Sequence, residues 1–408
     1  MLNINKKKIL EKIKILQEVG LYILALSFFV STAGFNIGLG IIAIGTIVKL
    51  FIAPKDINLG NKNILYWFLF SYIVLAIWSL FSVGGIDSFI YHLNRQSRFI
   101  VILLIGEAIR DKRVFFRFLV FLGISISLSS FNGIFEHLKY PSKRIDSFLK
   151  LTHYGPALME MLILFFAMII TKTYSYRYRI ILFSSFYLLG ITNILYMKTR
   201  AVWVGLFLGQ LAIMFFNKKK RYFILSIVII LIIAFIGKET YLRRAESIGN
   251  IKTDTSNTTR MKLWKAGIYT FENNIIFGAG SNNDNSTPFF KQYIIKKSFK
   301  IFHFNGDPHN MYISFLAEYG LGGLLYMILI FYIIPKEFFR YYKARKRFDL
   351  DGIFYGVIGM TIGFYIVGIF WNIWYRDYHP SLGFFIGLGI FNFLYSNNER
   401  TENEKKIS

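Results

Sequence analysis

Long apolar segments separated by short polar connections make up most of this chain. Apolar segments of about 17–25 residues predict transmembrane helices, because a helix needs about 20 residues to cross about 30 Å of hydrocarbon. We expect about twelve such spans, so the predicted fold class is an all-α polytopic membrane protein. The expected spans lie near residues 16–34, 36–53, 63–83, 96–109, 114–134, 155–171, 178–197, 200–216, 222–237, 309–334, 352–373 and 380–396.

One connection is much longer than the others: a polar segment, residues 238–308, separates the ninth and tenth spans. Within it, the sequence TSNTTRMKLWKAGIYTFENN predicts a surface helix that Ser256 or Thr258 can cap. The following sequence GAGSNNDNSTP is typical of a loop, because glycine and proline recur in it. The apolar side chains expected on one face of the surface helix are Met261, Trp264, Ile268 and Phe271.

Clusters of Lys and Arg predict the orientation of the spans. They lie before the first span, after the fourth and sixth, between the eighth and ninth, and between the tenth and eleventh. With an even number of spans and both termini in the cytoplasm, all these clusters face the cytoplasm, as the positive-inside rule requires. Much of the net charge of +25 is therefore a topology signal, and no nucleic-acid partner is expected.

This orientation divides the chain into four parts. Residues 1–237 hold transmembrane helices 1–9, residues 238–308 form a large and partly helical loop on the outer side, residues 309–397 hold transmembrane helices 10–12, and residues 398–408 form a cytoplasmic tail. The chain has no Cys, which excludes disulfides, thiolate metal sites and cysteine nucleophiles.

The outer side carries an unusual set of side chains. All six histidines fall there, together with basic residues that the positive-inside tendency does not favour. Basic groups on that side suggest an anionic ligand, although simple loop solvation explains Arg243 and Lys265 taken singly. The histidines are His92, His137, His153, His303, His309 and His379.

His309 is the leading candidate for catalysis. It follows Pro308 and stands with Asn310 at the mouth of the tenth span, so its imidazole is expected near the outer interface. An imidazole with an unperturbed pKa of about 6.5 suits a general base at neutral pH. The alternative interpretation is a histidine that only caps or hydrogen-bonds the start of a helix.

Four arginines on separate outer connections are candidates for binding the anion. Arg200 begins the eighth span, Arg260 lies on the loop helix, and Arg144 and Arg376 lie in two further outer loops. The planar guanidinium group matches phosphate oxygens. Each arginine taken alone also fits an interfacial anchor whose aliphatic stem lies along apolar surface.

Asn310, Glu318 and Trp264 are candidates for supporting roles. Glu318 lies about 13 Å along the tenth span from His309, at about 1.5 Å per residue. A carboxylate at that depth must be paired, protonated or functional, and pairing with another buried polar group is the favoured interpretation. The outer acids form no cluster, so we expect no metal site, and guanidinium groups can neutralise a pyrophosphate instead.

Three segments resemble the O-antigen ligase and O-antigen polymerase superfamily. They are TRAVWVG (199–205), TTRMKLWKAG with GAG (258–280) and PHNMYISFLAEYGLGGLL (308–325). The expected helices, the cytoplasmic termini and the one large periplasmic loop before the HN sequence also match that superfamily. In addition, RIDSFLKLTHYGPA (144–157) and NIWYRDYHP (372–380) are similar to segments of enterobacterial-type ligases.

The resemblance implies an O-antigen ligase of lipopolysaccharide biosynthesis: an inverting, metal-independent glycosyltransferase of the bacterial inner membrane that needs no soluble cofactor. Its donor would be a glycan on undecaprenyl diphosphate, and its acceptor a sugar hydroxyl of the lipid A core oligosaccharide at the periplasmic face. Membrane lipids are the remaining expected partners. By residue match, His309 would activate the acceptor hydroxyl, Arg200 and Arg260 would hold the donor diphosphate, and Arg144 and Arg376 would be supporting phosphate contacts.

Two alternatives stay open. A polymerase of the same superfamily would transfer one lipid-linked glycan onto another, and it would need a second cationic site for lipid. A lipid or polysaccharide flippase would be a transporter with charges along a path through the membrane. The spans hold few ionisable residues, such as Glu107, Glu160 and Glu318, and show no internal repeat, which disfavours the flippase.

Overall fold

The computed structural model describes residues 2–141, 143–145, 147–149, 151–171, 177–217, 255–297, 306–344, 351–374 and 378–407. These residues form helices joined by short connections, and none of them lies in a strand. Eight helices among them are long and apolar enough to cross a membrane. The prediction of an all-α polytopic membrane protein is confirmed, and the ninth expected span, residues 222–237, lies outside the described part.

The first six helices correspond to the first five expected spans. α1 and α2 form a helical hairpin that packs against α5 and α6. The short fourth span corresponds to α5, which a 3-10 turn at residues 97–99 joins to α4. The bounds are α1 (Leu2–Ser27), α2 (Thr32–Ile52), α3 (Lys62–Ser79), α4 (Gly85–Gln96), α5 (Ile100–Ala108) and α6 (Lys112–Lys139).

Polar side chains fix where several of these helices begin. Ser31 accepts a hydrogen bond from the backbone N–H of Gly34 at 3.2 Å and so caps α2. Asn61 caps α3 and Asp111 caps α6 in the same way. Each cap satisfies backbone donors that the first turn of a helix leaves without a partner inside the helix.

α7 (Leu151–Thr171) is the most deeply buried of the eight helices that could cross a membrane, and it contacts α8, α9, α17 and α18. Glycines allow α9 and α17 to approach closely: a Cβ at Gly209 would lie 2.7 Å from the carbonyl oxygen of Gly359. α18 does not end at the predicted tail, since it continues as a helix to Ile407. The remaining bounds are α8 (Arg177–Tyr196), α9 (Arg200–Asn217), α17 (Asp351–Phe370) and α18 (Tyr378–Ile407).

The expected tenth span is a broken helix and not a continuous one. α14 (Met311–Tyr319) ends at Gly320, whose φ of +55° lies in the left-handed region that glycine adopts readily. A 3-10 turn follows, and the chain then continues through α15 (Leu324–Ile328), a π-helical turn and α16 (Ile334–Ala344). The break lets the backbone N–H of Leu321 donate to the carbonyl oxygen of Ile275 at 2.8 Å, which attaches the outer segment to this span.

The expected surface helix is present as α12 (Thr255–Asn273), but the apolar side chains expected on one face do not form its buried side. Met261 and Ile268 are exposed, at 41% and 44%. The buried side of α12 carries small residues, among them Ala266 and Gly267, which permit close packing against α13 and α14. Thr258 lies inside the helix, so it does not cap the helix start.

The segment predicted as a loop after α12 is partly helical. α13 (Asn283–Lys296) begins within it, capped by Asn282, and Pro288 lies inside the helix. Glycine does mark a real turn, because Gly278 and Gly280 both have positive φ, at +74° and +110°. The sharp turn is needed because this backbone pairs with the end of α14: the N–H of Ala279 donates to the carbonyl oxygen of Ala317 at 2.8 Å.

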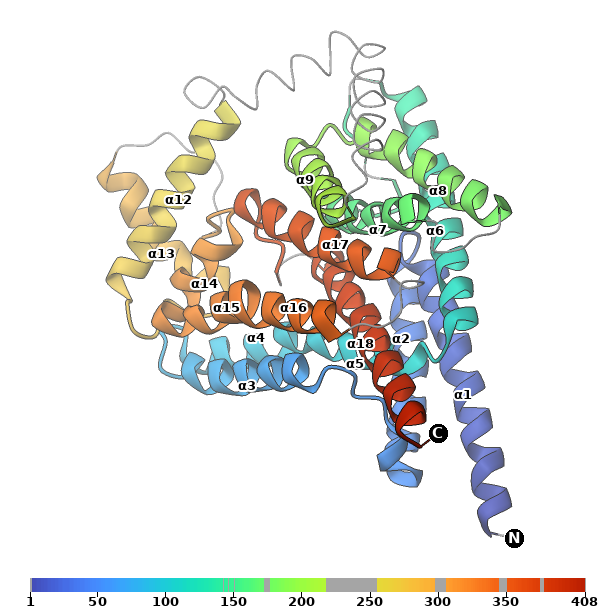
Figure 1. The fold of residues 1–408 in the computed structure, drawn as a ribbon. Coiled ribbons are helices and arrows are strands. Elements are labelled where there is room, and N and C mark those ends of the chain that lie inside the picture. The colour runs from blue at the N-terminus through green and yellow to red at the C-terminus, as the bar shows by residue number, and fades with distance from the viewer. Residues whose placement is uncertain are drawn as a thin grey trace.

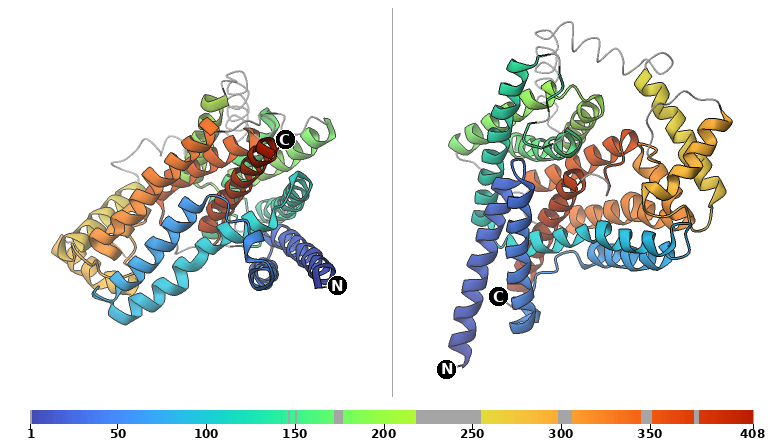
Figure 2. Two further views of the ribbon diagram at one scale, coloured as in Figure 1. Left: turned by 60° about the horizontal axis from the view of Figure 1, so that its bottom comes forward. Right: turned by 180° about the vertical axis from the view of Figure 1, so that it is seen from behind.

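The two ends of the chain lie on the same side of the molecule (Figure 1). The views in Figure 2 agree, and they place α12 and α13 on the side away from both termini. The start of α14 lies beside α12, which is where the sequence places the candidate chemistry.

Candidate functional site

His309 lies in a short turn that a buried carboxylate holds. Its backbone N–H donates to Oδ1 of Asp307 at 3.0 Å, and its Nδ1 lies 3.3 Å from Oδ2 of the same carboxylate. The Asp307 side chain is 1% exposed, whereas the imidazole is 41% exposed. The ring is therefore anchored through one nitrogen on its buried side and accessible on the other.

The backbone of His309 adopts a conformation that is uncommon for its residue type. Its φ is +51°, in the left-handed region that costs a residue with a Cβ roughly 1–2 kcal/mol. Such conformations persist where the surroundings enforce them, and they concentrate at functional sites. Here Pro308, with its fixed φ, and the two contacts to Asp307 constrain the turn.

The cap of α14 is Asn310 and not His309. The side-chain oxygen of Asn310 accepts from the backbone N–H groups of Tyr312 and Ile313, each at 3.0 Å. Its amide nitrogen donates to the carbonyl oxygen of Ile369 at 2.9 Å, which joins the start of α14 to the end of α17. Since the cap is supplied by its neighbour, the His309 imidazole is not needed for that purpose.

A second contact binds the His309 turn to the segment after α17. The side-chain amide of Asn372 lies 3.5 Å from Oδ1 of Asp307, and both side chains are buried. Sequence reasoning gave neither residue a role. The signal for Asp307 was present in the order Asp-Pro-His-Asn, because an acid two residues before a histidine can fold back onto it.

α12 brings Arg260 and Trp264 toward this turn. A Cβ at Gly267 would lie 2.9 Å from Cβ of Pro308 and 2.6 Å from Cγ2 of Ile313, so α12 touches the turn at that position. Arg260, Trp264 and Gly267 are spaced i, i+4 and i+7, which places them along one side of the helix. Both Arg260 and Trp264 are half-buried.

α9 brings Arg200 to the same end of α17 that Asn310 binds. The two helices are antiparallel, since Gly209 approaches Gly359 whereas Gly205 approaches Val367. Arg200 lies a further turn and a half toward the outer end, at the level where α17 finishes. The half-buried Arg200 and the His309 turn are thus both anchored to the carboxyl end of α17.

Arg144 lies in the loop between α6 and α7, and its side chain is exposed. This loop contacts the turn before α9, because the ammonium group of Lys198 donates to the carbonyl oxygen of Pro141 at 2.9 Å. The loop of Arg144 and the start of α9 are therefore neighbours. Arg376 lies outside the described residues, so the arginines that the structure brings toward one end are Arg144, Arg200 and Arg260.

Glu318 is not part of this group. It is 2% exposed and lies in the last turn of α14, at the end away from His309. Its carbonyl oxygen accepts from the backbone N–H of Gly280 at 2.9 Å, so this part of α14 holds the loop after α12. The Glu318 side chain is therefore buried in a part of α14 that holds the fold together, whereas the imidazole of His309 is accessible.

Among the described residues, no three His, Cys, Asp or Glu side chains cluster in a way that could hold a metal ion. Asp307, the acid nearest His309, binds the histidine itself. The side chains at this end of the described structure include a base with a buried carboxylate behind it and three guanidinium groups. Such a set can accept a proton and neutralise phosphate charge.

Comparison with known proteins gives a match to a family model. Residues 185–328 match a family model described as O-antigen ligase, and this stretch holds Arg200, Arg260, Trp264, His309 and Glu318. The match supports membership of the O-antigen ligase and polymerase superfamily, as the sequence motifs predicted. No curated protein matches the chain.

Proposed function

We propose that this member of the O-antigen ligase and polymerase superfamily is an O-antigen ligase of lipopolysaccharide biosynthesis. It transfers O-antigen polysaccharide from undecaprenyl diphosphate to a sugar hydroxyl of the lipid A core. The reaction takes place at the periplasmic face of the bacterial inner membrane, with both termini of the chain in the cytoplasm.

One observation carries the proposal. An accessible imidazole, in a left-handed backbone conformation, is backed by the buried carboxylate of Asp307. The carboxylate favours the tautomer with a proton on Nδ1, in which Nε2 is the basic nitrogen. This is the arrangement that a general base needs, and a histidine with a purely structural role has no need of the exposed side of its ring.

The reaction then follows as a single displacement. Nε2 of His309 takes the proton of the acceptor hydroxyl, whose oxygen attacks the anomeric carbon of the donor sugar. The bond from that carbon to the diphosphate oxygen breaks, and undecaprenyl diphosphate leaves with the electron pair. Attack on the face opposite the leaving group inverts the configuration at the anomeric carbon. The proton passes from His309 to solvent before the next cycle.

The guanidinium groups stabilise the leaving diphosphate. Arg200 and Arg260 are the principal contacts, because both are half-buried and lie on helices that meet the end of α17 or the His309 turn. A guanidinium group in a partly desolvated site stabilises phosphate charge that develops in the transition state, which removes the need for a divalent cation. Arg144 and Arg376 act as supporting contacts.

The residues proposed for supporting roles position the reacting groups or support the fold. Asn310 fixes the start of α14 to α17 and thereby fixes the backbone next to His309. Trp264 presents a half-buried indole on the α12 side that carries Arg260, suited to packing against the donor. Glu318 has a structural role at the far end of α14.

The test is analysis of lipopolysaccharide from a deletion strain, together with its lipid-linked intermediates. Loss of the O-antigen ladder while lipid-linked polymer still accumulates supports the ligase. Accumulation of single-repeat species indicates the polymerase, and failure to translocate lipid-linked glycan indicates a flippase. Purified protein should transfer glycan from donor to acceptor in excess EDTA, and dependence on Mg²⁺ or Mn²⁺ would contradict the proposed leaving-group chemistry.

A further inference from the structure

A cavity of about 780 Å³ lies at the other end of the bundle from His309. Its walls come from α1, the end of α2, the connection from α2 to α3, the end of α5 and the last part of α18. Five basic and two acidic side chains line it: Lys14, Lys49, Lys55, Lys62, Arg110, Asp56 and Glu107. The cavity is therefore a basic one, and it lies on the side of the molecule that carries both termini.

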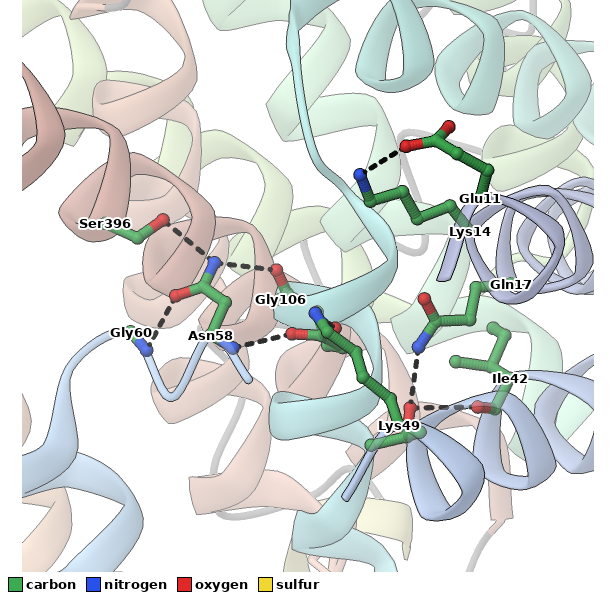
Figure 3. A network of polar contacts seen from close by, with 11 residues as sticks. Glu11, Lys14, Gln17, Ile42, Lys49, Asn58, Gly60, Gly106 and Ser396 are labelled. Atoms are coloured by element: carbon green, nitrogen blue, oxygen red, sulfur yellow. Dashed lines mark hydrogen bonds and ion pairs between the residues drawn. The ribbon is translucent and has the colours of Figure 1, made fainter. Parts of the chain in front are cut away.

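The walls of this cavity are held in place by a buried polar network (Figure 3). The backbone N–H of Asn58 donates to Glu107 at 2.7 Å, and its side-chain amide donates to the hydroxyl of Ser396 at 2.9 Å and to the carbonyl oxygen of Gly106 at 3.2 Å. Glu107 also forms a buried ion pair with Lys49. The network joins α2, α5 and α18, so the cavity is formed before any ligand arrives.

The connection from α2 to α3 is also fixed on its other side. Gly60 has a φ of +57°, and a Cβ there would lie 2.5 Å from Cβ of Asn392. The backbone N–H of Asn61 donates to Oδ1 of Asn392 at 3.1 Å, and the Asn61 side chain donates to Glu337 at 2.9 Å. These contacts fix the backbone of the connection, from which the exposed side chains of Lys55 and Lys62 extend.

Two of the basic side chains that line the cavity form no ion pair within the described part of the chain. Lys14 pairs with Glu11 and Arg110 pairs with Glu18, and the hydrogen bond and charge of Lys14 hold the pKa of the Glu11 carboxyl below its usual value. Among the described residues, Lys55 and Lys62 form no ion pair.

The position of the Lys62 charge is also electrostatically unfavourable. It is the first residue of α3, where the helix dipole already places positive charge and where the first turn holds no acidic residue. A cation at that position favours an anion beside it, because the charge of the ammonium group adds to the positive end of the helix dipole.

The depth and the surroundings of the cavity fit a lipid. α2 has 21 residues, which is about the thickness of the hydrocarbon core, so the connection after Ile52 lies at the level of the headgroups. The outer surface of α2 next to the cavity is apolar and exposed, with Phe51 at 83%, Leu50 at 52% and Ile47 at 54%. Acyl chains can lie along that surface while a phosphate group occupies the cavity.

We propose that this cavity binds the phosphate headgroup of an anionic membrane phospholipid, with Lys55 and Lys62 as its principal contacts. Basic pockets between transmembrane helices recognise such headgroups. In the orientation proposed above, the lipid belongs to the cytoplasmic leaflet. The site is separate from the glycosyl-transfer site, and its occupancy does not depend on the reaction that the protein catalyses.

The test compares lipid binding to detergent-purified full-length protein by native mass spectrometry. The probes are phosphatidylglycerol, phosphatidylcholine and inorganic phosphate, and the variant is Lys55→Gln with Lys62→Gln. We expect the wild-type protein to prefer phosphatidylglycerol, and the double variant to bind it about tenfold or more weakly. The matched control, Lys336→Gln with Lys343→Gln, removes the same charge from exposed positions on α16 and should bind as the wild type does.

A thermal melt provides a second measurement on the same samples. Phosphatidylglycerol should raise the Tm of the wild-type and control proteins and leave that of the Lys55/Lys62 variant nearly unchanged, because a ligand that binds only the folded state stabilises it. Equal affinity for the two lipids, or an equal effect in the two double variants, would show that these lysines serve orientation alone. Stabilisation by inorganic phosphate as large as by lipid would identify a small-anion site and overturn the lipid assignment.

Discussion

The carboxylate of Asp307 contacts His309 twice, through the backbone N–H at 3.0 Å and through Nδ1 at 3.3 Å. One oxygen fixes the turn and the other faces the imidazole. The two contacts couple the shape of the backbone to the orientation of the ring, so that a change at the buried acid is transmitted to the accessible base.

Asp307→Asn should separate these two effects. The remaining side-chain oxygen can still accept from the backbone N–H, so the turn is kept, but the carboxylate facing Nδ1 is lost and the wrong tautomer is favoured. We expect the transfer rate to fall by about 10²-fold or more while donor affinity and Tm change little. The exposed Asp284→Asn is the control. If the variant loses donor affinity and has a lower Tm along with its lower transfer rate, Asp307 only supports the fold.

Arg200→Lys and Arg260→Lys should impair transfer strongly, since each keeps the charge but loses the planar fork that binds two phosphate oxygens. The measurement is transfer rate and donor-lipid affinity at matched expression. Lys265→Ala removes an exposed charge from the same helix as Arg260 and should leave both values unchanged. Wild-type rates in both lysine variants would show that the arginines are interfacial anchors.

Gly267→Ala tests the contact between α12 and the His309 turn. The added Cβ would meet Pro308 and Ile313 at 2.9 Å and 2.6 Å, so we expect a loss of about 1–3 kcal/mol of stability and reduced transfer. Gly40→Ala is the matched control, because a Cβ there meets nothing within 4 Å and helix propensity favours alanine by about 1 kcal/mol. The readouts are Tm in detergent and transfer rate. A Gly267→Ala protein as stable and active as the control would show that the close approach has no role.

The orientation of the protein can be tested by labelling, because the chain has no cysteine of its own. Ile295 on α13 is 76% exposed, and Lys343 on α16 is also exposed. An impermeant maleimide should label Ile295→Cys in cells with an intact inner membrane, and Lys343→Cys only after that membrane is opened. The reverse pattern would contradict both the topology and the proposed function.

Much of the fold could be predicted from the sequence because membrane spans are long and apolar. The span that begins at Arg200 was predicted within one residue of its ends, and the start of α14 within two. The break at Gly320 does not follow from the sequence, since the contact that accompanies it joins Leu321 to the carbonyl oxygens of Ile275 and Ile276, far away in sequence. The buried side of α12 also differs from the apolar face expected from the sequence, because Leu263 and Ala266 pack there against Phe290 of α13, a contact that the spacing of apolar residues does not show.

For the candidate site, residue types and spacing identified His309 and the arginines as positions with suitable chemistry. The grouping depends on tertiary structure, through the anchoring of Asn310 to Ile369 and the approach of Gly267 to Pro308. The roles of Asp307 and Asn372 follow from contacts that hydropathy and charge patterns do not encode.

The most direct test of the account is the transfer rate of His309→Asn, measured beside its affinity for the donor lipid. Asparagine tolerates the left-handed backbone conformation better than most residues do, so the turn should be kept. An amide cannot accept a proton at neutral pH, and general-base assistance is typically worth about 10²–10⁴-fold. We therefore predict a folded protein that binds the donor as the wild type does and transfers glycan at least about 10²-fold more slowly. A His309→Asn protein that transfers glycan at the wild-type rate would contradict the assignment of His309 as the base.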